Sequence, residues 1–139
     1  MQSDLTRVPI IKVWDILLVP LQGEITDDVA AQVRSEVLDR IHNEGATGLV
    51  IDVTALWVMD SHLCSVISRL AMASALMGAR TFLCGMTPDV ALTIHAMGLE
   101  LDGVATALSL EEALETLGVV PPAPEIEEEG LLEEADGSA

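Results

Sequence analysis

One serine of this sequence stands where its hydroxyl could do chemistry. Ser61 follows Asp60 at the point where an apolar run and a short loop lead into a helical pattern. A phosphate in the first turn of a helix meets unpaired backbone N–H groups and the positive end of the helix dipole. It would add about −1.5 to −2 charges beside Asp60 and so alter a binding surface without unfolding the domain. The simpler alternative is that Asp60 or Ser61 only caps the helix, and position alone favours that alternative.

Signatures of catalysis are missing around this serine and elsewhere. The sequence has no glycine-rich run that ends in Gly-Lys-Ser/Thr, and its sole lysine, Lys12, lies in an early apolar run, so a P-loop is excluded. No Gly-x-Ser-x-Gly elbow surrounds any serine. His62 follows Ser61 directly, and adjacent residues of a helix point in different directions. A serine hydrolase that uses Ser61 is therefore disfavoured, since no histidine is placed to act as its base.

The sequence gives little support for a metal site or for a second modification site. Of His62, Cys64, Cys84 and His95, no pair has a recognised zinc-ligand spacing, so we expect no metal, no cofactor and two ordinary buried thiols. Thr87 precedes Pro88 at the predicted start of a helix, where a capping role explains it sufficiently. Phosphorylation of Thr87 is the minority interpretation.

Composition limits the class of partner. The 139 residues carry a net charge of −17 with only six basic residues, so no basic patch can hold nucleic acid or an anionic membrane. A positively charged protein surface is the more natural complement. Half of the residues are hydrophobic and 2% are aromatic, which predicts an aliphatic core and hints at apolar surface covered by another subunit. Neither a secretory signal nor a membrane-spanning run is recognisable, so we expect a cytoplasmic protein.

Strand and helix patterns alternate along the chain up to Gly118. The predicted strands are 10–14, 16–21, 48–53, 81–84 and 104–108, and the predicted helices are 27–43, 61–77, one from 88 onward and one over 109–118. The first two strands are joined across Asp15 as a hairpin. Thr26 is the expected cap of the first helix, and Gly45 the expected end. This alternation predicts an α/β sheet domain.

The last segment differs sharply from the rest. Residues 119–139 follow this pattern with seven acids, no bases and three prolines, and such a segment cannot bury enough apolar area to fold. We therefore predict a domain over 1–118 and a disordered acidic tail over 119–139. A solubilising role is preferred for the tail. The alternative is a docking strip for a basic partner, with Leu131 and Leu132 as its apolar anchor.

A loop predicted over 54–60 presents Ser61 and contains Trp57. Trp57 is either a plug that folds back over the sheet edge or an anchor for a partner, since Trp is enriched among residues that dominate binding energy. The two interpretations are nearly balanced, and we favour the anchor narrowly.

The whole pattern resembles the STAS domain from about Val8 to Gly118. Asp52-Val53-Thr54 resembles that family's strand end, and Met59-Asp60-Ser61 resembles its Asp-Ser phosphoacceptor motif at the start of the central helix. Within the family, the chain is most similar to RsbS-like subunits of the bacterial stressosome. Five further stretches carry this similarity: residues 8–13, 48–52, 76–80, 88–93 and 106–111.

The resemblance implies a fold and a function. The STAS fold is a small mixed sheet, mostly parallel with an N-terminal antiparallel hairpin, packed by about four helices. The chain would then be a non-enzymatic scaffold and antagonist that sequesters a serine kinase of the histidine-kinase-like ATPase superfamily until Ser61 is phosphorylated. Asp60, Trp57 and His62 are the expected partner-binding residues. A sensor-bearing STAS paralogue would co-assemble with it into a large oligomer, and a serine phosphatase is a further expected partner.

One departure and two alternatives accompany the resemblance. His62-Leu63-Cys64 replaces the continuation found in sporulation-type antagonists, which argues against that subgroup. The main alternative is an anti-sigma factor antagonist that binds an anti-sigma-factor kinase as a free monomer or dimer. A STAS domain that binds a nucleotide has no residue-level support in the sequence.

Overall fold

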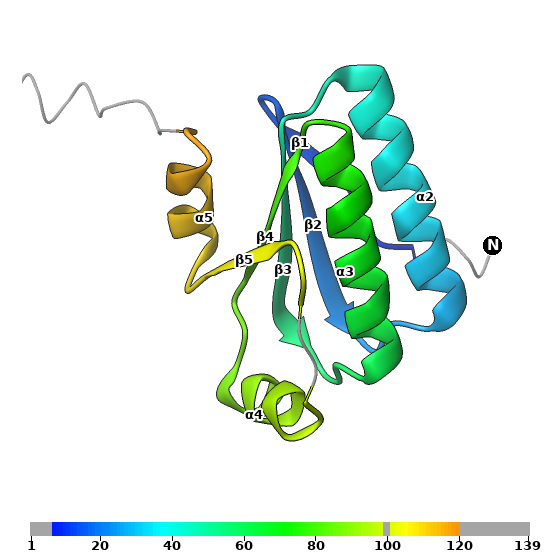
Figure 1. Ribbon diagram of the computed structural model, residues 1–139, viewed down its shortest axis with the longest axis vertical. Coiled ribbons are helices and arrows are strands. Elements are labelled where there is room, and N and C mark those ends of the chain that lie inside the picture. The colour runs from blue at the N-terminus through cyan, green and yellow to red at the C-terminus, as the bar shows by residue number, and fades with distance from the viewer. Residues whose placement is uncertain (1–6, 99–100, 120–139) are drawn as a thin grey trace, which may run out of the picture.

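The computed structural model describes residues 7–98 and 101–119, which form a mixed five-stranded sheet with the order β1-β2-β3-β4-β5 (Figure 1). The strands are β1 (Ile11–Val13), β2 (Ile16–Gly23), β3 (Gly48–Leu56), β4 (Arg80–Cys84) and β5 (Val104–Ala107). β1 pairs with β2 antiparallel, and every other neighbouring pair is parallel. The predicted hairpin and the predicted mixed sheet are both confirmed.

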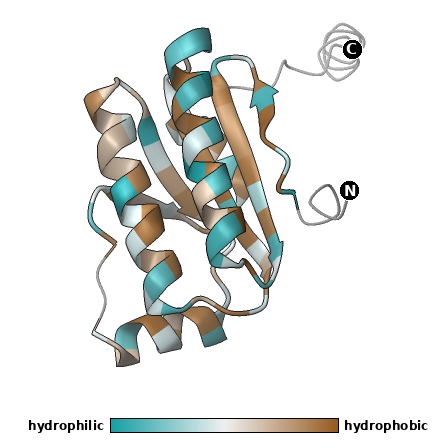
Figure 2. Ribbon diagram, turned by 90° about the vertical axis from the view of Figure 1, so that its right-hand side faces the viewer, coloured by the Kyte–Doolittle hydropathy of each residue, from teal (hydrophilic) through white to brown (hydrophobic). Residues whose placement is uncertain are grey.

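Four helices surround this sheet within the described residues. They are α2 (Asp27–Glu44), α3 (Ser61–Leu76), α4 (Pro88–Ala96) and α5 (Leu110–Thr116). The long helices α2 and α3 lie side by side on one face, the short α5 covers part of the other face, and α4 lies beyond one end of the sheet (Figure 1). Figure 2 shows α2 and α3 in front of strands that are largely hydrophobic in colour.

The main core lies between the sheet and these two long helices. Leu49, Ile51 and Val53 alternate along β3 and face α2 and α3 with at most 2% of their surface exposed. Val50 points the other way, into a smaller cluster under α5 that also contains Phe82. Successive residues of a strand point to opposite faces, and helices cover both faces at β3. The strand is therefore apolar at almost every position. The aliphatic core expected from the composition is what the structure contains.

The ends of α2 agree with the sequence signals. The Thr26 side chain accepts a hydrogen bond from the Val29 backbone N–H at 3.3 Å. Gly45 closes the helix in the left-handed conformation, with φ of 69°, and its N–H donates to the Ile41 carbonyl. Both are the capping roles predicted from the residue types.

β3 is longer than predicted. Its last residues, Ala55 and Leu56, pair with Gln22 and Gly23 at the end of β2, beyond an irregularity in register after Pro20. The predicted loop over 54–60 is therefore wrong at its beginning, and the loop starts only at Trp57. Propensity could not show this, because the pairing partner lies about thirty residues earlier in the sequence.

The hairpin turn carries an unusual tryptophan. Trp14 has φ of 57°, in the left-handed region, and 64% of its surface is exposed. The adjacent Asp15 is held by Thr47, whose N–H donates to the Asp15 carbonyl at 2.8 Å and whose hydroxyl donates to its carboxylate at 3.0 Å. These bonds fix the turn in spite of the strain at Trp14.

At the other boundary, the chain continues to Val119. Val119 is buried in the cluster under α5, and its N–H donates to the Leu114 carbonyl at 2.8 Å. The rest of the predicted tail, residues 120–139, lies outside the described residues, so its disorder and the division of the chain at residue 118 stay predictions.

Candidate functional site

The segment that leads to Ser61 is pinned at both of its ends. At the end of β3, the Trp57 N–H donates to the Gly23 carbonyl at 2.8 Å. Two residues later, Met59 is 2% exposed and anchors the loop in the main core. The chain therefore enters α3 from a fixed position at the carboxyl ends of the parallel strands.

Asp60, not Ser61, caps α3. The Asp60 carboxylate accepts a hydrogen bond from the Leu63 backbone N–H at 2.8 Å, and Asp60 itself has extended backbone geometry. Ser61 is the first residue of the helix and is exposed. Because the aspartate supplies the cap, the fold does not need the serine hydroxyl, and the simpler capping explanation does not account for Ser61.

His62 is turned away from Ser61 towards the neighbouring helix. Its Nε2 lies 3.3 Å from Oδ1 of Asp27, the first residue of α2, and both side chains are more than half exposed. This contact joins the first turns of α2 and α3. Sequence reasoning placed His62 beside the candidate serine but missed its partner, which lies 35 positions earlier in the chain.

Trp57 and its neighbour are exposed. Trp57 exposes 77% of its surface and Val58 exposes 51%, so Trp57 is not a plug over the described part of the chain. The helix at the same end of the sheet, α4, also presents apolar side chains to solvent, with Leu92 at 66% and Met97 at 42% (Figure 1). We call Trp57, Val58, Asp60, Ser61 and His62 the phosphoacceptor end of the domain, after the phosphoacceptor role that the sequence predicts for Ser61.

Thr87 has the structural role expected of it. Its side chain accepts from the Val90 N–H at 3.2 Å and caps α4, with Pro88 in the first turn. The hydroxyl is thus already engaged in holding a helix end, unlike that of Ser61.

The two thiols are buried and inert. Burial raises the pKa of the Cys64 thiol, with a smaller contribution from the Asp60 carboxylate. Burial, followed by the charges of Asp52 and Glu111, raises the pKa of the Cys84 thiol to about 11. Thiolates are the reactive and metal-binding form, so neither residue is suited to that chemistry near neutral pH. Among the described residues there is also no group of three His, Cys, Asp or Glu side chains that could hold a metal ion.

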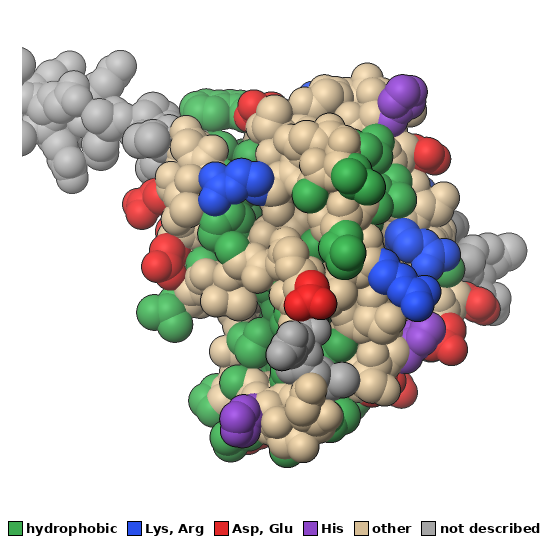
Figure 3. Space-filling view, in the orientation of Figure 1, with side chains coloured by type: hydrophobic (Ala, Val, Ile, Leu, Met, Phe, Trp, Pro, Cys, Tyr) green, Lys and Arg blue, Asp and Glu red, His purple; other side chains and the backbone are tan. Residues whose placement is uncertain are grey.

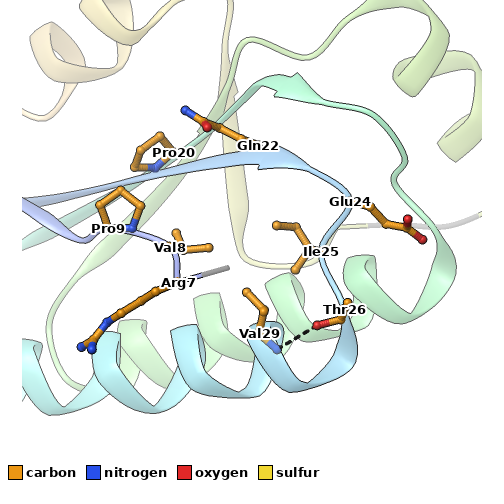
Figure 4. Close-up of a pocket in the computed structure, with 9 residues that line it drawn as sticks. All are labelled: Arg7, Val8, Pro9, Pro20, Gln22, Glu24, Ile25, Thr26 and Val29. Atoms are coloured by element: carbon orange, nitrogen blue, oxygen red, sulfur yellow. Dashed lines mark hydrogen bonds between the residues drawn. The ribbon is translucent and has the colours of Figure 1, made fainter. Parts of the chain in front are cut away.

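A surface cleft of about 230 Å³ lies between the first described residues, the end of β2 and the start of α2 (Figure 4). Its walls are Arg7, Val8, Pro9, Pro20, Gln22, Glu24, Ile25, Thr26 and Val29. No residue of the phosphoacceptor end lines it. The one hydrogen bond drawn among its walls runs from the Val29 backbone N–H to the Thr26 hydroxyl oxygen, the cap of α2.

In residues 7–98 and 101–119, no helix has both the length and the apolarity that crossing a membrane requires.

Comparison with known proteins identifies a matching family, one curated relative and two similar solved structures. The family model described as "STAS domain" matches residues 7–113. The chain is 29% identical over 109 residues to the RsbT co-antagonist protein RsbRA of Bacillus subtilis (strain 168), an alignment that covers 78% of this chain and 40% of RsbRA. The chain thus spans about two fifths of the length of that curated relative.

Two solved structures are similar over most of their own length. A serine-to-glutamate variant of RsbS from Moorella thermoacetica superposes with a TM-score of 0.70 at 40% identity, covering 80% of this chain and 94% of that one. A chain from a structure described as the molecular architecture of the stressosome, a signal integration and transduction hub, gives a TM-score of 0.64 at 36% identity, covering 78% and 95%.

Proposed function

Because this chain belongs to the STAS-domain family, we propose that it is a phosphorylatable scaffold and antagonist in a bacterial partner-switching stress pathway. In this role it holds a serine kinase at the phosphoacceptor end until that kinase phosphorylates Ser61. The observation that carries the proposal is that two adjacent residues at the start of α3 have different roles. Asp60 caps the helix, and the exposed Ser61 hydroxyl stays available.

The relatives support this role. The family match confirms the resemblance inferred from the sequence, and RsbRA is named as a co-antagonist of RsbT. The two solved structures are described as RsbS and as part of the stressosome. Because the chain covers 40% of RsbRA, we take from that relative only its STAS portion, and propose that longer, sensor-bearing paralogues of this kind assemble with the present chain.

The geometry suits a switch driven by charge. A phosphate on Ser61 would lie beside the Asp60 carboxylate and the backbone N–H groups of the first turn of α3, so it would be tolerated by the fold. A partner that covers Trp57 and Val58 would have to bury or neutralise that charge. Desolvation of an unpaired charge is costly, so phosphorylation should release the partner.

The kinase is expected to belong to the histidine-kinase-like ATPase superfamily, and a serine phosphatase is the expected further partner. The chain itself acts as a binding module in this scheme and catalyses no reaction. We expect it to work in the cytoplasm, where a kinase finds ATP.

The alternative is a free antagonist of an anti-sigma-factor kinase outside a large particle. Size distinguishes the two: a megadalton species with a sensor-bearing paralogue supports the scaffold, and a monomer or dimer under the same conditions supports the alternative. Sedimentation of the chain with and without the paralogue provides this measurement.

Incubation with the cognate kinase and ATP, followed by intact mass and peptide mapping, tests the phosphoacceptor. We expect one phosphate on the wild-type chain and none on Ser61→Ala, which should keep the kinase bound in the presence of ATP. Ser61→Asp should weaken kinase binding, though less than phosphate, because a carboxylate carries one charge and fewer acceptor oxygens.

Two other hydroxyls serve as controls. Ser65 is exposed on α3 one turn beyond Ser61, and Thr87 caps α4. Ser65→Ala and Thr87→Ala should each still accept one phosphate at Ser61. Unchanged phosphorylation of Ser61→Ala, or its loss in Thr87→Ala, would rule out Ser61 as the main site.

A further inference from the structure

Three of the chain's six Lys and Arg make no ion pair with any described residue: Arg80, whose guanidinium lies over the Phe82 ring, and the exposed Arg34 and Arg69. The sequence has six Lys and Arg against 23 Asp and Glu, so acids are abundant. Three cations pair with acids in the described structure: these pairs are Arg7–Glu36, Lys12–Glu44 and Arg40–Glu44. Arg34 on α2 and Arg69 on α3 are both exposed and make no ion pair with any described residue.

Their own helices offer these two arginines no acid. A helical side chain meets the residues three and four positions away on either side. For Arg34 these are Ala30, Ala31, Val37 and Leu38, and for Arg69 they are Ser65, Val66, Met72 and Ala73. Arg40, by contrast, has Glu44 four positions later and bonds to it at 3.0 Å. The two exposed guanidinium groups are therefore free to take an anion from outside.

Arg34 and Arg69 also lie next to each other. The contact between Asp27 and His62 at 3.3 Å fixes how α2 and α3 are aligned, and the helices run in the same direction (Figure 1). Arg34 and Arg69 each follow that contact by seven residues. Seven residues return a helix to nearly the same side after a rise of about 10.5 Å. Figure 3 shows Lys or Arg side chains gathered where α2 and α3 meet, just above a histidine.

We propose that this arginine pair, Arg34 with Arg69, is a docking site for the acidic segment 125–136 of a second copy of the chain. Two like charges side by side repel each other, and a bound anion removes that repulsion. Guanidinium groups suit carboxylates because their planar fork can donate two parallel hydrogen bonds. Segment 125–136 is the strongest complement on this chain, with seven acids and no base.

The position of Val119 favours a second copy over the chain's own segment. Val119 is buried under α5, on the face of the sheet opposite α2 and α3 (Figure 1). An extended chain covers about 3.3–3.6 Å per residue, so Glu125 lies within roughly 20 Å of Val119. Each helix layer alone is about 10–12 Å thick, and the path must also go round an edge of the sheet. The first four acids, over 125–129, are poorly placed to make that journey in their own chain, so a neighbouring copy can offer the whole segment while the chain itself can offer only the last three acids.

The test uses the full-length chain, and it needs neither the kinase nor Ser61, so its failure would leave the proposed function untouched. Arg34→Lys and Arg69→Lys keep the charge and introduce an amine, in a chain whose only other lysine is Lys12. A carbodiimide joins an amine to a nearby carboxylate as an amide, and takes up the lost water to become a urea. Unlabelled and ¹⁵N-labelled chains are mixed, treated, digested and mapped by mass spectrometry.

We expect cross-links from position 34 or 69 to the peptide 125–136, in pairs that combine both isotopes. These links should disappear at about 1 M salt, where the screening length falls to about 3 Å. Arg80→Lys is the matched control, since Arg80 lies over the Phe82 ring at 5.4 Å and pairs with no described acid. It should give no link to the segment in pairs that combine both isotopes, although the chain's own segment starts on the same face of the sheet.

Other results would overturn the proposal. Links within one isotope only would mean that the chain holds its own segment, and links to acids of the folded domain would mean a different occupant. Absence of any link while Lys12 still couples to Glu44 would mean no docking. In a second measurement, Arg34→Gln with Arg69→Gln should weaken self-association about fivefold, the scale of two exposed ion pairs, and an unchanged association constant contradicts the proposal.

Discussion

A single short stretch of chain connects the fully buried interior of this molecule to a largely exposed surface. Val53 on β3 is 0% exposed between the sheet and the long helices, and only four residues later Trp57 is 77% exposed. In the interior, apolar side chains are used to hold the sheet to α2 and α3. At the phosphoacceptor end, apolar and polar side chains that contribute little to the core are presented to solvent. Stability and partner binding should therefore respond to different substitutions.

The largest effect on stability is expected in the interior. Val53→Ala removes two methyl groups from a fully buried site, so the free energy of unfolding should fall by roughly 2–3 kcal/mol. Kinase affinity, measured well below the melting temperature, should not change, because Val53 does not reach the surface. Urea titration and a binding titration on the same sample check both halves. A loss of affinity larger than threefold would show that the interior and the phosphoacceptor end do not respond independently to substitution.

A second interior effect depends on pH. The pKa of Cys84 is about 11 in the folded protein against a reference of 9.0, so the unfolded chain loses this proton first. This contribution to stability is fully present below pH 9 and is lost as pH rises through about 11, with roughly 2 kcal/mol lost by pH 11. The chain has no tyrosine and one lysine, so the main other group that titrates in this range is the Cys64 thiol, whose pKa burial also raises.

Urea titrations from pH 8 to 11 measure that loss, and Cys84→Ala supplies the control. The variant should lose markedly less stability over the same range. An equally steep fall in both proteins would assign the loss to other groups.

A smaller effect on stability is expected at the start of α3, where Asp60 and Ser61 should differ. Asp60→Ala removes the cap of α3 and should lower the free energy of unfolding by about 1 kcal/mol. Ser61→Ala should change it by less than about 0.5 kcal/mol, since the exposed hydroxyl caps nothing. Thermal melts of the two variants, beside Thr87→Ala as a known cap on α4, provide the comparison. A larger loss of stability in Ser61→Ala than in Asp60→Ala would show that Ser61 has a structural role.

The smallest effect on stability belongs to the largest side chain. Trp57→Ala should change the free energy of unfolding by less than about 0.5 kcal/mol, because the ring is mostly in solvent. Association with the kinase or with a neighbouring subunit should weaken by about 2 kcal/mol or more if Trp57 is an anchor. A large melting shift with unimpaired binding would contradict the anchor role and indicate that Trp57 packs over the sheet edge.

Much of the fold was predictable because its signals are local. The caps at Thr26, Gly45 and Thr87 depend on residues three or four positions away, and all three have the predicted role. The cap of α5 is equally local: the Ser109 side chain accepts from the Glu112 N–H, and the Glu112 carboxylate accepts from the Leu108 N–H. The resemblance of Asp60-Ser61 and its surroundings to the STAS domain is confirmed at the level of the family.

Features that depend on distant partners were not predictable. The extension of β3 to Leu56 requires Gln22 and Gly23, and the orientation of His62 requires Asp27. No pattern in the sequence indicates which of two strand ends will pair or which acid a histidine will meet. Exposure of Trp57 is likewise a property of the assembled domain, since a tryptophan in a loop is compatible with either burial or exposure.

The two exposed tryptophans have a practical optical consequence. Trp14 and Trp57 lie near opposite ends of β2, a strand of eight residues, and each is more than 60% exposed. With no tyrosine and one phenylalanine, nearly all of the near-ultraviolet fluorescence comes from two indoles already in water. Their emission should therefore shift little when the chain unfolds, and shift to the blue when another molecule covers either end. Tryptophan emission should therefore detect binding by this protein more sensitively than it detects unfolding.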